Sequence, residues 1–284
     1  MRGDGKPVNT ASRNNKEATN MKIGTVGDNC IDSYKEMGKA FPGGNPVNVG
    51  VYFVRLGGEA SYVGVVGNDE YGEFMKKCIA NKGVDATHIH TLEGKTAVTE
   101  VELVDGDRVM AGYDEGVLAD FKLTEEDIEF LAGHDLVVSS VYGNVHDSFA
   151  DIRAKGVKLA FDASDVPERE ASKVAVKNCD YFFYSNDDGD TEEIRAQMKK
   201  YKEEGPELVI CMQGEKGSIV YDGNEYHKYG IVECEVVDTM GAGDSYIAGF
   251  LKGILEGKTI KESMHMGAAN ATETIGYFGA WEVE

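Results

Sequence analysis

Short apolar runs alternate along the chain with longer stretches whose apolar residues recur every three or four positions. Residues 21–27 (MKIGTVG) form one apolar run, residues 45–56 carry valines at helical spacing, and residues 60–66 form the next run. A short apolar run predicts a buried strand, whereas the three-to-four-residue spacing predicts an amphipathic helix. The order of elements at this end of the chain is therefore β-α-β.

The same alternation continues downstream. Further helices are predicted over residues 70–81, 124–132, 147–155 and 191–204, and further strands over 136–141, 157–161, 181–184 and 208–212. Apolar strands separated by helices are typical of an α/β fold, in which a mostly parallel sheet is covered on both faces. Ligands of such sheets bind beyond the carboxyl ends of the strands.

Two segments, residues 30–41 and 96–113, depart from this pattern. The second (TAVTEVELVDGDRVMAGY) alternates apolar and polar residues around a Val-Asp-Gly-Asp turn, which is typical of a hairpin with one solvated face. We interpret the two segments as strands of a small β lid that covers a substrate and excludes water. An edge hairpin without such a role is the alternative.

Composition and charge narrow the class of protein. With 42% hydrophobic and 28% charged residues among 284, residues 21–284 are expected to form a single domain, preceded by a polar, non-periodic leader over 1–20. A formal charge of -21 argues against binding to nucleic acid or to anionic membranes. The sequence has no apolar run of about 18 residues and no signal-peptide pattern, so we expect a cytoplasmic protein. The five widely spaced cysteines are expected to be free thiols.

The most informative stretch is residues 237–246 (VDTMGAGDSY), which we interpret as a strand end, a glycine turn and the start of a helix over 246–255. Glycines let the backbone approach a ligand closely, and the N–H groups at a helix start attract an anion. The stretch therefore predicts a phosphate-binding turn. Asp244 could cap the helix or accept a proton from a substrate hydroxyl, and a turn with no ligand is the alternative.

Together with the preceding Asp238-Thr239, this turn resembles the C-terminal signature of the PfkB (ribokinase-like) family of carbohydrate kinases. Gly43-Gly44-Asn45-Pro46-Val47-Asn48 is similar to the N-terminal signature of the family, and the resemblance extends over residues 21–281. It implies a ribokinase-like three-layer α/β/α fold with a mostly parallel central sheet and a small β-strand lid. It also implies an ATP-dependent kinase that uses Mg²⁺ and phosphorylates an alcohol group.

The resemblance assigns roles to individual residues. It implies Asp244 as the catalytic base and the backbone of Gly241, Ala242 and Gly243 as the binding site for the transferring group. It implies substrate contacts from Asp28, Asp32, Gly43, Gly44, Asn45 and Asn48, to which we add Arg108 as a candidate because of its position in the lid. It implies nucleotide contacts from Asn186, Gln213, Gly214 and Gly217, and a monovalent cation such as K⁺ beside Asp238 and Thr239.

One family motif is incomplete. Relatives carry Asn-x-x-Glu, which helps to position Mg²⁺, where this chain reads Ser185-Asn186-Asp187-Asp188-Gly189. Asn186 matches the motif and the glutamate has no counterpart, so the residues that position Mg²⁺ are left open.

Stretches at 27–32, 39–45, 101–103 with 107–109, and 113–121 narrow the choice of substrate, because they are similar to members of the family that phosphorylate the 6-hydroxyl of a sugar amine. A small sugar amine and ATP are therefore the expected partners. A kinase for another sugar or for a nucleoside is one alternative, and a sugar-binding sensor without catalysis is another. The exposed strands of the lid also allow a homodimer through edge pairing.

Overall fold

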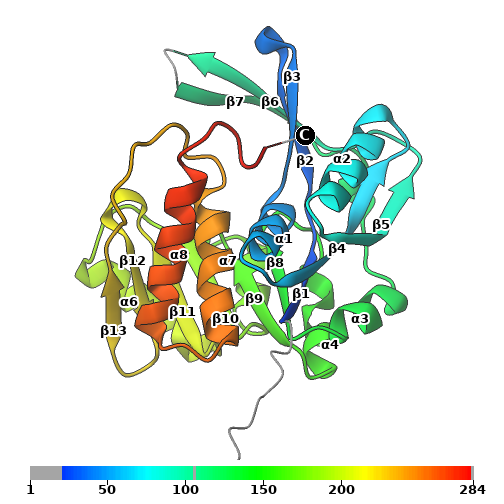
Figure 1. Ribbon diagram of the computed structural model, residues 1–284. Coiled ribbons are helices and arrows are strands. Elements are labelled where there is room, and N and C mark those ends of the chain that lie inside the picture. The colour runs from blue at the N-terminus through cyan, green and yellow to red at the C-terminus, as the bar shows by residue number, and fades with distance from the viewer. Residues whose placement is uncertain (1–20, 105–106, 283–284) are drawn as a thin grey trace, which may run out of the picture.

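The main body is built on one nine-stranded sheet with the strand order β13-β12-β11-β10-β9-β8-β1-β4-β5 (Figure 1). The computed structural model describes residues 21–104 and 107–282, with the side chains of residues 36 and 103–110 outside the description. The predicted leader over 1–20 lies outside the described residues. The strands are β1 (Lys22–Val26), β4 (Glu59–Gly67), β5 (Asp85–Leu92), β8 (Leu136–Ser140), β9 (Lys158–Asp162), β10 (Tyr181–Ser185), β11 (Leu208–Met212), β12 (Ser218–Tyr221) and β13 (Tyr226–Tyr229).

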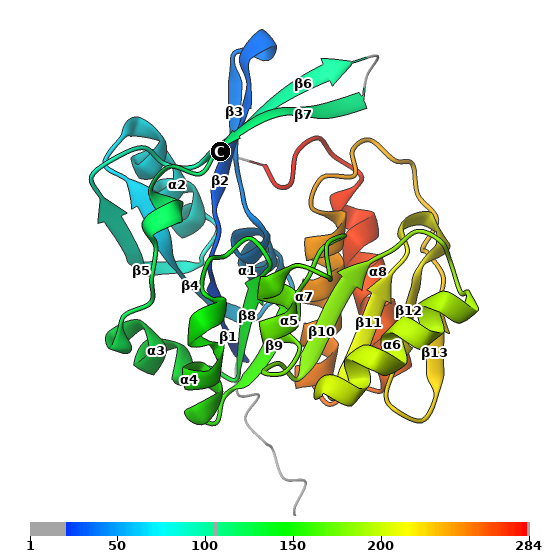
Figure 2. The same cartoon turned by 180° about the vertical axis from the view of Figure 1, so that it is seen from behind.

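In this strand order, all neighbouring pairs between β11 at one side and β5 at the other are parallel. Only β12 and β13 join the main sheet antiparallel. Helices α1, α7 and α8 lie on one face of the sheet and α3, α4 and α6 on the other, as Figures 1 and 2 show. The helices are α1 (Asn45–Arg55), α2 (Glu70–Asn81), α3 (Glu125–Ala132), α4 (Phe149–Ala154), α5 (Glu170–Ala175), α6 (Glu192–Glu204), α7 (Ala242–Leu255) and α8 (Ile260–Thr274). The predicted three-layer α/β/α architecture is confirmed.

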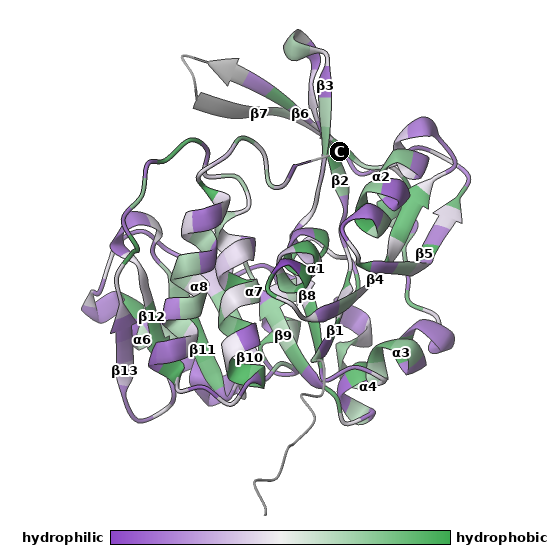
Figure 3. Cartoon of the chain, in the orientation of Figure 1, coloured by the Kyte–Doolittle hydropathy of each residue, from purple (hydrophilic) through white to green (hydrophobic). Residues whose placement is uncertain are grey.

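Each face of the sheet carries its own hydrophobic core. Val137 and Phe182 pack into one core, whereas their neighbours Val138 and Phe183 pack into the other. Successive side chains of a strand point to opposite faces, so a continuous apolar run supplies both cores at once. Figure 3 shows the result, with hydrophobic strands between helices whose outer surfaces are hydrophilic.

The lid is a separate four-stranded sheet with the order β3-β2-β6-β7. It consists of β2 (Cys30–Tyr34), β3 (Lys39–Gly43), β6 (Val98–Val104) and β7 (Asp107–Asp114). The hairpin β2–β3 and the hairpin β6–β7 are each antiparallel, and a parallel pairing of β2 with β6 joins them. The predicted lid is thus confirmed, and it projects from the carboxyl end of the main sheet (Figure 1).

Strand β1 is the point at which the chain changes direction across the sheet. From β1 the chain proceeds to β4 and β5 on one side, and it then returns to β8 on the other side of β1. Ligands of open α/β sheets bind beyond the carboxyl ends of the strands at such a switch point. A functional site is therefore expected among the segments that follow β1, β8 and β9.

Two sequence predictions about the C-terminal third are wrong. Residues 230–240 contain no strand, because Val236 and Val237 are exposed and the Val237 N–H donates to the Ile275 carbonyl rather than to a neighbouring strand. Helix α7 begins at Ala242 and not at Tyr246, so part of the glycine turn is already helical. Strands β12 and β13 and helices α5 and α8 were not predicted.

Helices α7 and α8 pack closely along a row of small residues. A Cβ at Gly249 would lie 2.5 Å from the Met266 carbonyl oxygen and 2.9 Å from the Gly267 Cα. These distances are shorter than a van der Waals contact and involve backbone atoms, which cannot rotate away. The glycine therefore sets how near the two helices come.

We predict that Gly249→Ala lowers the free energy of unfolding by about 1–3 kcal/mol through overpacking, despite the better helix propensity of alanine. Urea denaturation measures the change. Gly230→Ala is the matched control, because a Cβ there meets nothing within 4 Å, and it should shift stability by less than about 0.5 kcal/mol. Equal stability of the two variants would show that the helices are not held by this contact.

Candidate functional site

Three carboxylates from distant parts of the sequence converge on one residue, Asn45. The Asn45 Nδ2 group donates to Asp162 Oδ2 at 2.8 Å and to Asp244 Oδ1 at 2.6 Å, and the Asn45 backbone N–H donates to Asp28 Oδ2 at 3.1 Å. Asp28 follows β1, Asp162 ends β9, and Asp244 lies in the first turn of α7. The cluster therefore lies at the switch point of the sheet.

The position of Asn45 depends on the glycine pair before it. Gly44 adopts φ 109°, and a Cβ there would lie 2.6 Å from the Asn29 Cα, so only glycine fits. A Cβ on Gly43 would lie 3.0 Å from Asp32 Oδ2, which places the Asp32 carboxylate against the same turn. Close approach of the backbone at residues 28–29 explains Gly44, and contact with the Asp32 side chain explains Gly43, without any ligand.

Asp244 receives a second hydrogen bond from the next turn of α1. The Asn48 Nδ2 group donates to Asp244 Oδ2 at 2.7 Å, and Asn48 Oδ1 accepts from Trp281 Nε1 at 2.8 Å. Asn48 and Trp281 are buried, whereas Asp244 remains partly exposed. Both oxygens of Asp244 are thus held in place, and the residue stays partly exposed.

Burial changes the acidity of this cluster. Burial raises the pKa of Asp244 to about 6, the hydrogen bonds from Asn48 and Asn45 lower it, and the charges of Asp28 and Asp32 raise it further. Burial, together with the charges of Asp244 and Asp28, raises the pKa of Asp162 to about 7. Burial also raises the pKa of Asp28. Asp244 is therefore mostly ionised at pH 7, and its pKa lies close enough to 7 for the carboxylate to accept a proton.

A candidate anion-binding site adjoins Asp244. Gly241, the N-cap residue of helix α7, adopts the left-handed conformation (φ 74°), and the helix has no side-chain cap. The Ala242 N–H donates to the Thr239 carbonyl at 3.2 Å, which leaves the N–H groups of Gly243 and Asp244 to face outward from the first turn. An uncapped helix N-terminus with exposed N–H groups favours a phosphate.

The four predicted nucleotide-binding residues lie at the same edge of the sheet. Asn186 follows β10 and Gln213 follows β11, and the Asn186 N–H donates to the Met212 carbonyl. Gly214 and Gly217 take positive φ angles of 52° and 91° in the turn after Gln213.

This turn borders the start of α7, because a Cβ on Gly243 would lie 3.8 Å from the Met212 side chain. Gln213 is buried, and its Nε2 group has no hydrogen-bond partner among the described residues. An unpartnered buried donor beside an anion site fits a nucleotide phosphate or ribose.

The predicted cation sites stay predictions. Asp238 accepts hydrogen bonds from the Met240 N–H at 3.1 Å and from the Gly279 N–H at 2.6 Å, and Thr239 is exposed. Within the described part of the chain no three His, Cys, Asp or Glu side chains gather as a metal-binding group. Arg108 lies in β7, and its side chain is outside the description.

Three residues of this site were missed by sequence reasoning: Asp162, Ser140 and Trp281. Ser140 ends β8 and donates to Asp28 Oδ1 at 2.5 Å. Asp162 and Ser140 could have been found as polar residues at the carboxyl ends of apolar strands, where ligands bind. Trp281 gives no such signal, because its contact with Asn48 depends on how the chain returns after α8.

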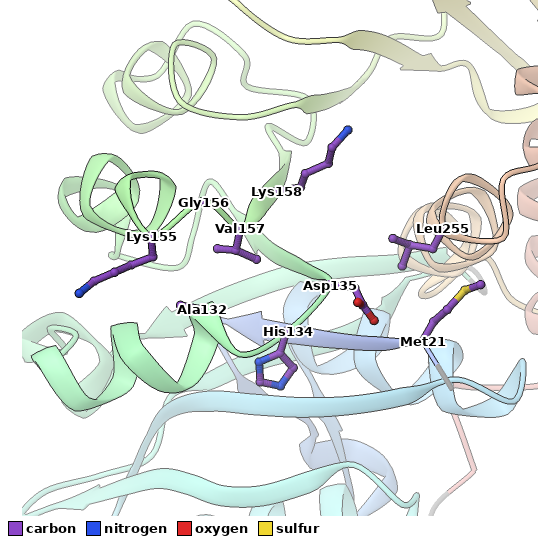
Figure 4. A pocket seen from close by; sticks show the side chains of 9 residues that line it. All are labelled: Met21, Ala132, His134, Asp135, Lys155, Gly156, Val157, Lys158 and Leu255. Carbon is purple, nitrogen blue, oxygen red and sulfur yellow. The ribbon is translucent and has the colours of Figure 1, made fainter. Parts of the chain in front are cut away.

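A separate groove of about 470 Å³ lies at the opposite, amino-terminal edge of the sheet (Figure 4). It is lined by Met21, His134, Asp135, Lys155 and Lys158, among others. Lys155 forms an ion pair with Glu129, and Lys158 with Glu207. The groove therefore does not present these lysines as free cations, and it is remote from the acidic cluster.

The family model described as "pfkB family carbohydrate kinase" matches residues 20–283. The chain is 44% identical to fructoselysine 6-kinase of Escherichia coli (strain K12) over 259 residues, which is 91% of this chain and 99% of that protein. It is 32% identical to fructosamine kinase FrlD of Bacillus subtilis over 265 residues, with 92% and 93% of the two chains covered.

Solved structures with the same fold include two ribokinases. The ribokinase of Thermotoga maritima superimposes with a TM-score of 0.76 at 22% identity and covers 92% of this chain and 94% of that chain. The ribokinase of Arabidopsis thaliana, solved with ribose and ATP, gives a TM-score of 0.78 at 20% identity, with 91% and 94% covered. These similarities confirm the ribokinase-like fold.

The raised pKa of Asp162 predicts a pH-dependent effect of Asp162→Asn on stability. In the unfolded chain this carboxyl ionises near its ordinary pKa of 3.8, and in the folded protein near 7. Between these values the folded state holds the extra proton, so the contribution of Asp162 to stability falls as pH rises. Relative to the wild type, the variant should gain stability from pH 5 to 7 by up to about 1.4 kcal/mol per pH unit.

Urea denaturation at pH 5, 6, 7 and 8 measures this difference. Asp165→Asn, at an exposed position three residues further on, is the control and should change stability by less than about 0.5 kcal/mol at each pH. A stability difference for Asp162→Asn that stays constant from pH 5 to 8 would show that the buried carboxyl does not titrate as described.

Proposed function

Because the chain belongs to the pfkB family of carbohydrate kinases, we propose that it transfers the γ-phosphoryl group of ATP to the 6-hydroxyl of fructoselysine. The observation that carries the proposal is the position of Asp244, an accessible carboxylate held by two amides directly beside an uncapped helix N-terminus. This arrangement places a proton acceptor next to an anion site, as phosphoryl transfer to an alcohol requires. The 44% identity to fructoselysine 6-kinase supports the choice of substrate.

Asp244 acts as the general base in this proposal. The hydrogen bonds from Asn45 and Asn48 fix its two oxygens, so the carboxylate needs little reorientation when a hydroxyl approaches. A pKa of about 6 keeps it ionised at neutral pH and lets it accept the hydroxyl proton as the oxygen attacks. Asn45 Oδ1 has no partner among the described residues, which leaves it as an acceptor for a sugar hydroxyl.

The residues around the start of α7 fit the phosphates of ATP. When bound, ATP supplies the phosphoryl group, and Mg²⁺ on its phosphate oxygens neutralises charge. The N–H groups of Gly243 and Asp244 donate to the phosphoryl oxygens, and the glycines of the turn permit that close approach. Gln213 Nε2 contributes a donor from the turn after β11.

The acidic lining of the site favours a substrate that carries a positive charge. The hydrogen-bond donors found for Asp28, Asp162 and Asp244 in the described residues are amides, a hydroxyl and backbone N–H groups, all of them neutral. Fructoselysine carries a protonated amine where lysine joins the sugar, whereas fructose and ribose carry none. Attraction between this amine and the carboxylates distinguishes a sugar amine from a neutral sugar.

The remaining parts of the proposal rest on the sequence. Closure of the lid excludes water from the transfer, Arg108 contacts the substrate from β7, and a monovalent cation binds beside Asp238 and Thr239. Two copies of the chain pair through their lids, and the protein acts in the cytoplasm. No helix among the described residues could cross a bilayer.

We predict that Asp244→Asn lowers kcat by a hundredfold or more and leaves the affinity for ATP unchanged, because the amide keeps the shape of the side chain and removes the base. Release of ADP with fructoselysine, ATP and Mg²⁺ measures kcat, and calorimetry measures ATP binding. The exposed Asp165→Asn variant is the control and should turn over like the wild type. Unchanged turnover in Asp244→Asn would remove Asp244 from its role as base.

We also predict that kcat/KM for fructoselysine exceeds that for fructose at least tenfold at about 0.05 M salt, and that this ratio decreases in about 0.5 M salt because ions screen the attraction. Parallel assays at saturating ATP, with ribose and adenosine included, measure the ratio. A preference for another acceptor would keep the kinase and change its substrate. No activity on any of the four would favour a sugar-binding sensor.

A further inference from the structure

The chain contains a single tryptophan, Trp281, and its indole reaches the functional site. Trp281 lies in the segment after α8 and is only 4% exposed. Its Nε1–H group donates to Asn48 Oδ1 at 2.8 Å, and Asn48 Nδ2 donates to Asp244 Oδ2 at 2.7 Å. One amide group therefore connects the C-terminal segment to the carboxylate.

The chemistry of the three groups fixes the orientation of this amide. An indole N–H can only donate a hydrogen bond and an ionised carboxylate can only accept one, whereas an asparagine side chain has one end of each kind. The amide oxygen must therefore face Trp281, and the amide N–H₂ group must face Asp244. Without the indole donor, a rotation of the amide by half a turn would place its oxygen against the carboxylate.

The segment that carries Trp281 is tied to the body by several contacts. The Gly279 N–H donates to Asp238, and the Tyr52 hydroxyl donates to the Ala280 carbonyl. The ring of Phe278 lies 5.8 Å from that of Phe41 and 5.9 Å from that of Tyr34, both in the lid. These contacts keep the indole at a fixed place relative to α1.

We propose that Trp281 is a positioning residue for phosphoryl transfer, which holds the Asn48 amide in the orientation that donates to Asp244 and so keeps this carboxylate ionised and correctly aligned. The inference rests on the proposed function for its kinetic consequences. The expected effect on the protonation of Asp244 depends only on the hydrogen bonds described above.

Other charged and titratable groups also face this site. Asp28, Asp32 and Asp162 disfavour ionisation of Asp244 by their negative charge or by sharing Asn45 with it. On α1, the Tyr52 hydroxyl group, whose pKa burial raises, lies near Asp244, and the Arg55 guanidinium lies 4.7 Å from the centre of the Tyr52 ring. Trp281→Phe replaces none of these side chains, so a change in the titration of Asp244 reports the loss of the indole donor.

The test compares the wild type with Trp281→Phe, Asn48→Ala and the double variant. Phenylalanine keeps an aromatic ring and removes the N–H group. NMR of the aspartate carboxyl carbons, with the Asp244 signal assigned by Asp244→Asn, follows the titration without any need for activity. The midpoint for Asp244 should move up by about one pH unit in Trp281→Phe, and the double variant should move no further than Asn48→Ala alone, because both changes act through one hydrogen bond.

A second form of the protein removes the donor alone. Because the chain has one tryptophan, incorporation of the benzothiophene analogue replaces only the Trp281 N–H, with sulfur, and keeps the bicyclic shape. This form should show the same upward shift. Tyr277→Phe is the control on the same segment, since the Tyr277 hydroxyl donates to the Ala280 carbonyl and not to Asn48, and it should leave the midpoint unchanged.

Kinetics give the second readout. In Trp281→Phe, kcat with fructoselysine should fall about tenfold while KM for ATP stays the same, and the acid limb of the pH–rate profile should move up with the carboxyl titration. An unchanged midpoint in Trp281→Phe and in the benzothiophene form, or shifts that add in the double variant, would overturn the positioning role. A shifted midpoint in a protein that does not phosphorylate fructoselysine would support the positioning role and refute the proposed substrate.

Discussion

One residue, Asn45, holds together the ends of three segments that are far apart in the sequence, through its side-chain amide and its backbone N–H group. Its donors reach the carboxylates after β1, at the end of β9 and at the start of α7. Three closely spaced carboxylates, two of them buried and the third only partly exposed, would repel one another strongly, so each needs a donor, and their pKa values stay raised even with these donors. Keeping these carboxylates together lowers the stability of the folded protein. Such a cluster is consistent with a site arranged for chemistry rather than for folding.

The lid, the C-terminal segment and the active site form one connected structure. Asp32 in β2 lies against Gly43 at the base of the lid, which leads directly into Asn45. On the other side, the C-terminal segment contacts Tyr34 and Phe41 of the lid through Phe278 and contacts Asn48 through Trp281. A change in the position of the lid is thus transmitted to groups that hold Asp244.

Local sequence patterns were sufficient to predict the parallel sheet, most helices and the lid, because buried strands and amphipathic helices carry their periodicity in the sequence. The glycine signatures were also readable, and residues such as Asp28, Asn48 and Asp244 do come together. The strand expected before Asp238 was wrong, because exposed valines mimic a strand when their burial is unknown. Asp162 was missed although its place at the end of an apolar strand gave a signal, whereas Trp281 was missed because its role depends on a contact across 233 positions, which no local pattern encodes.

The central claim is that Asp244 receives the proton of the sugar hydroxyl beside the anion site of α7. A crystal structure with fructoselysine and a non-hydrolysable ATP analogue tests it directly. The account predicts the 6-hydroxyl oxygen at about 2.6–3.2 Å from the Asp244 carboxylate, with the terminal phosphate against the Gly243 N–H. A 6-hydroxyl bound to another carboxylate, or a phosphate bound away from α7, would contradict it.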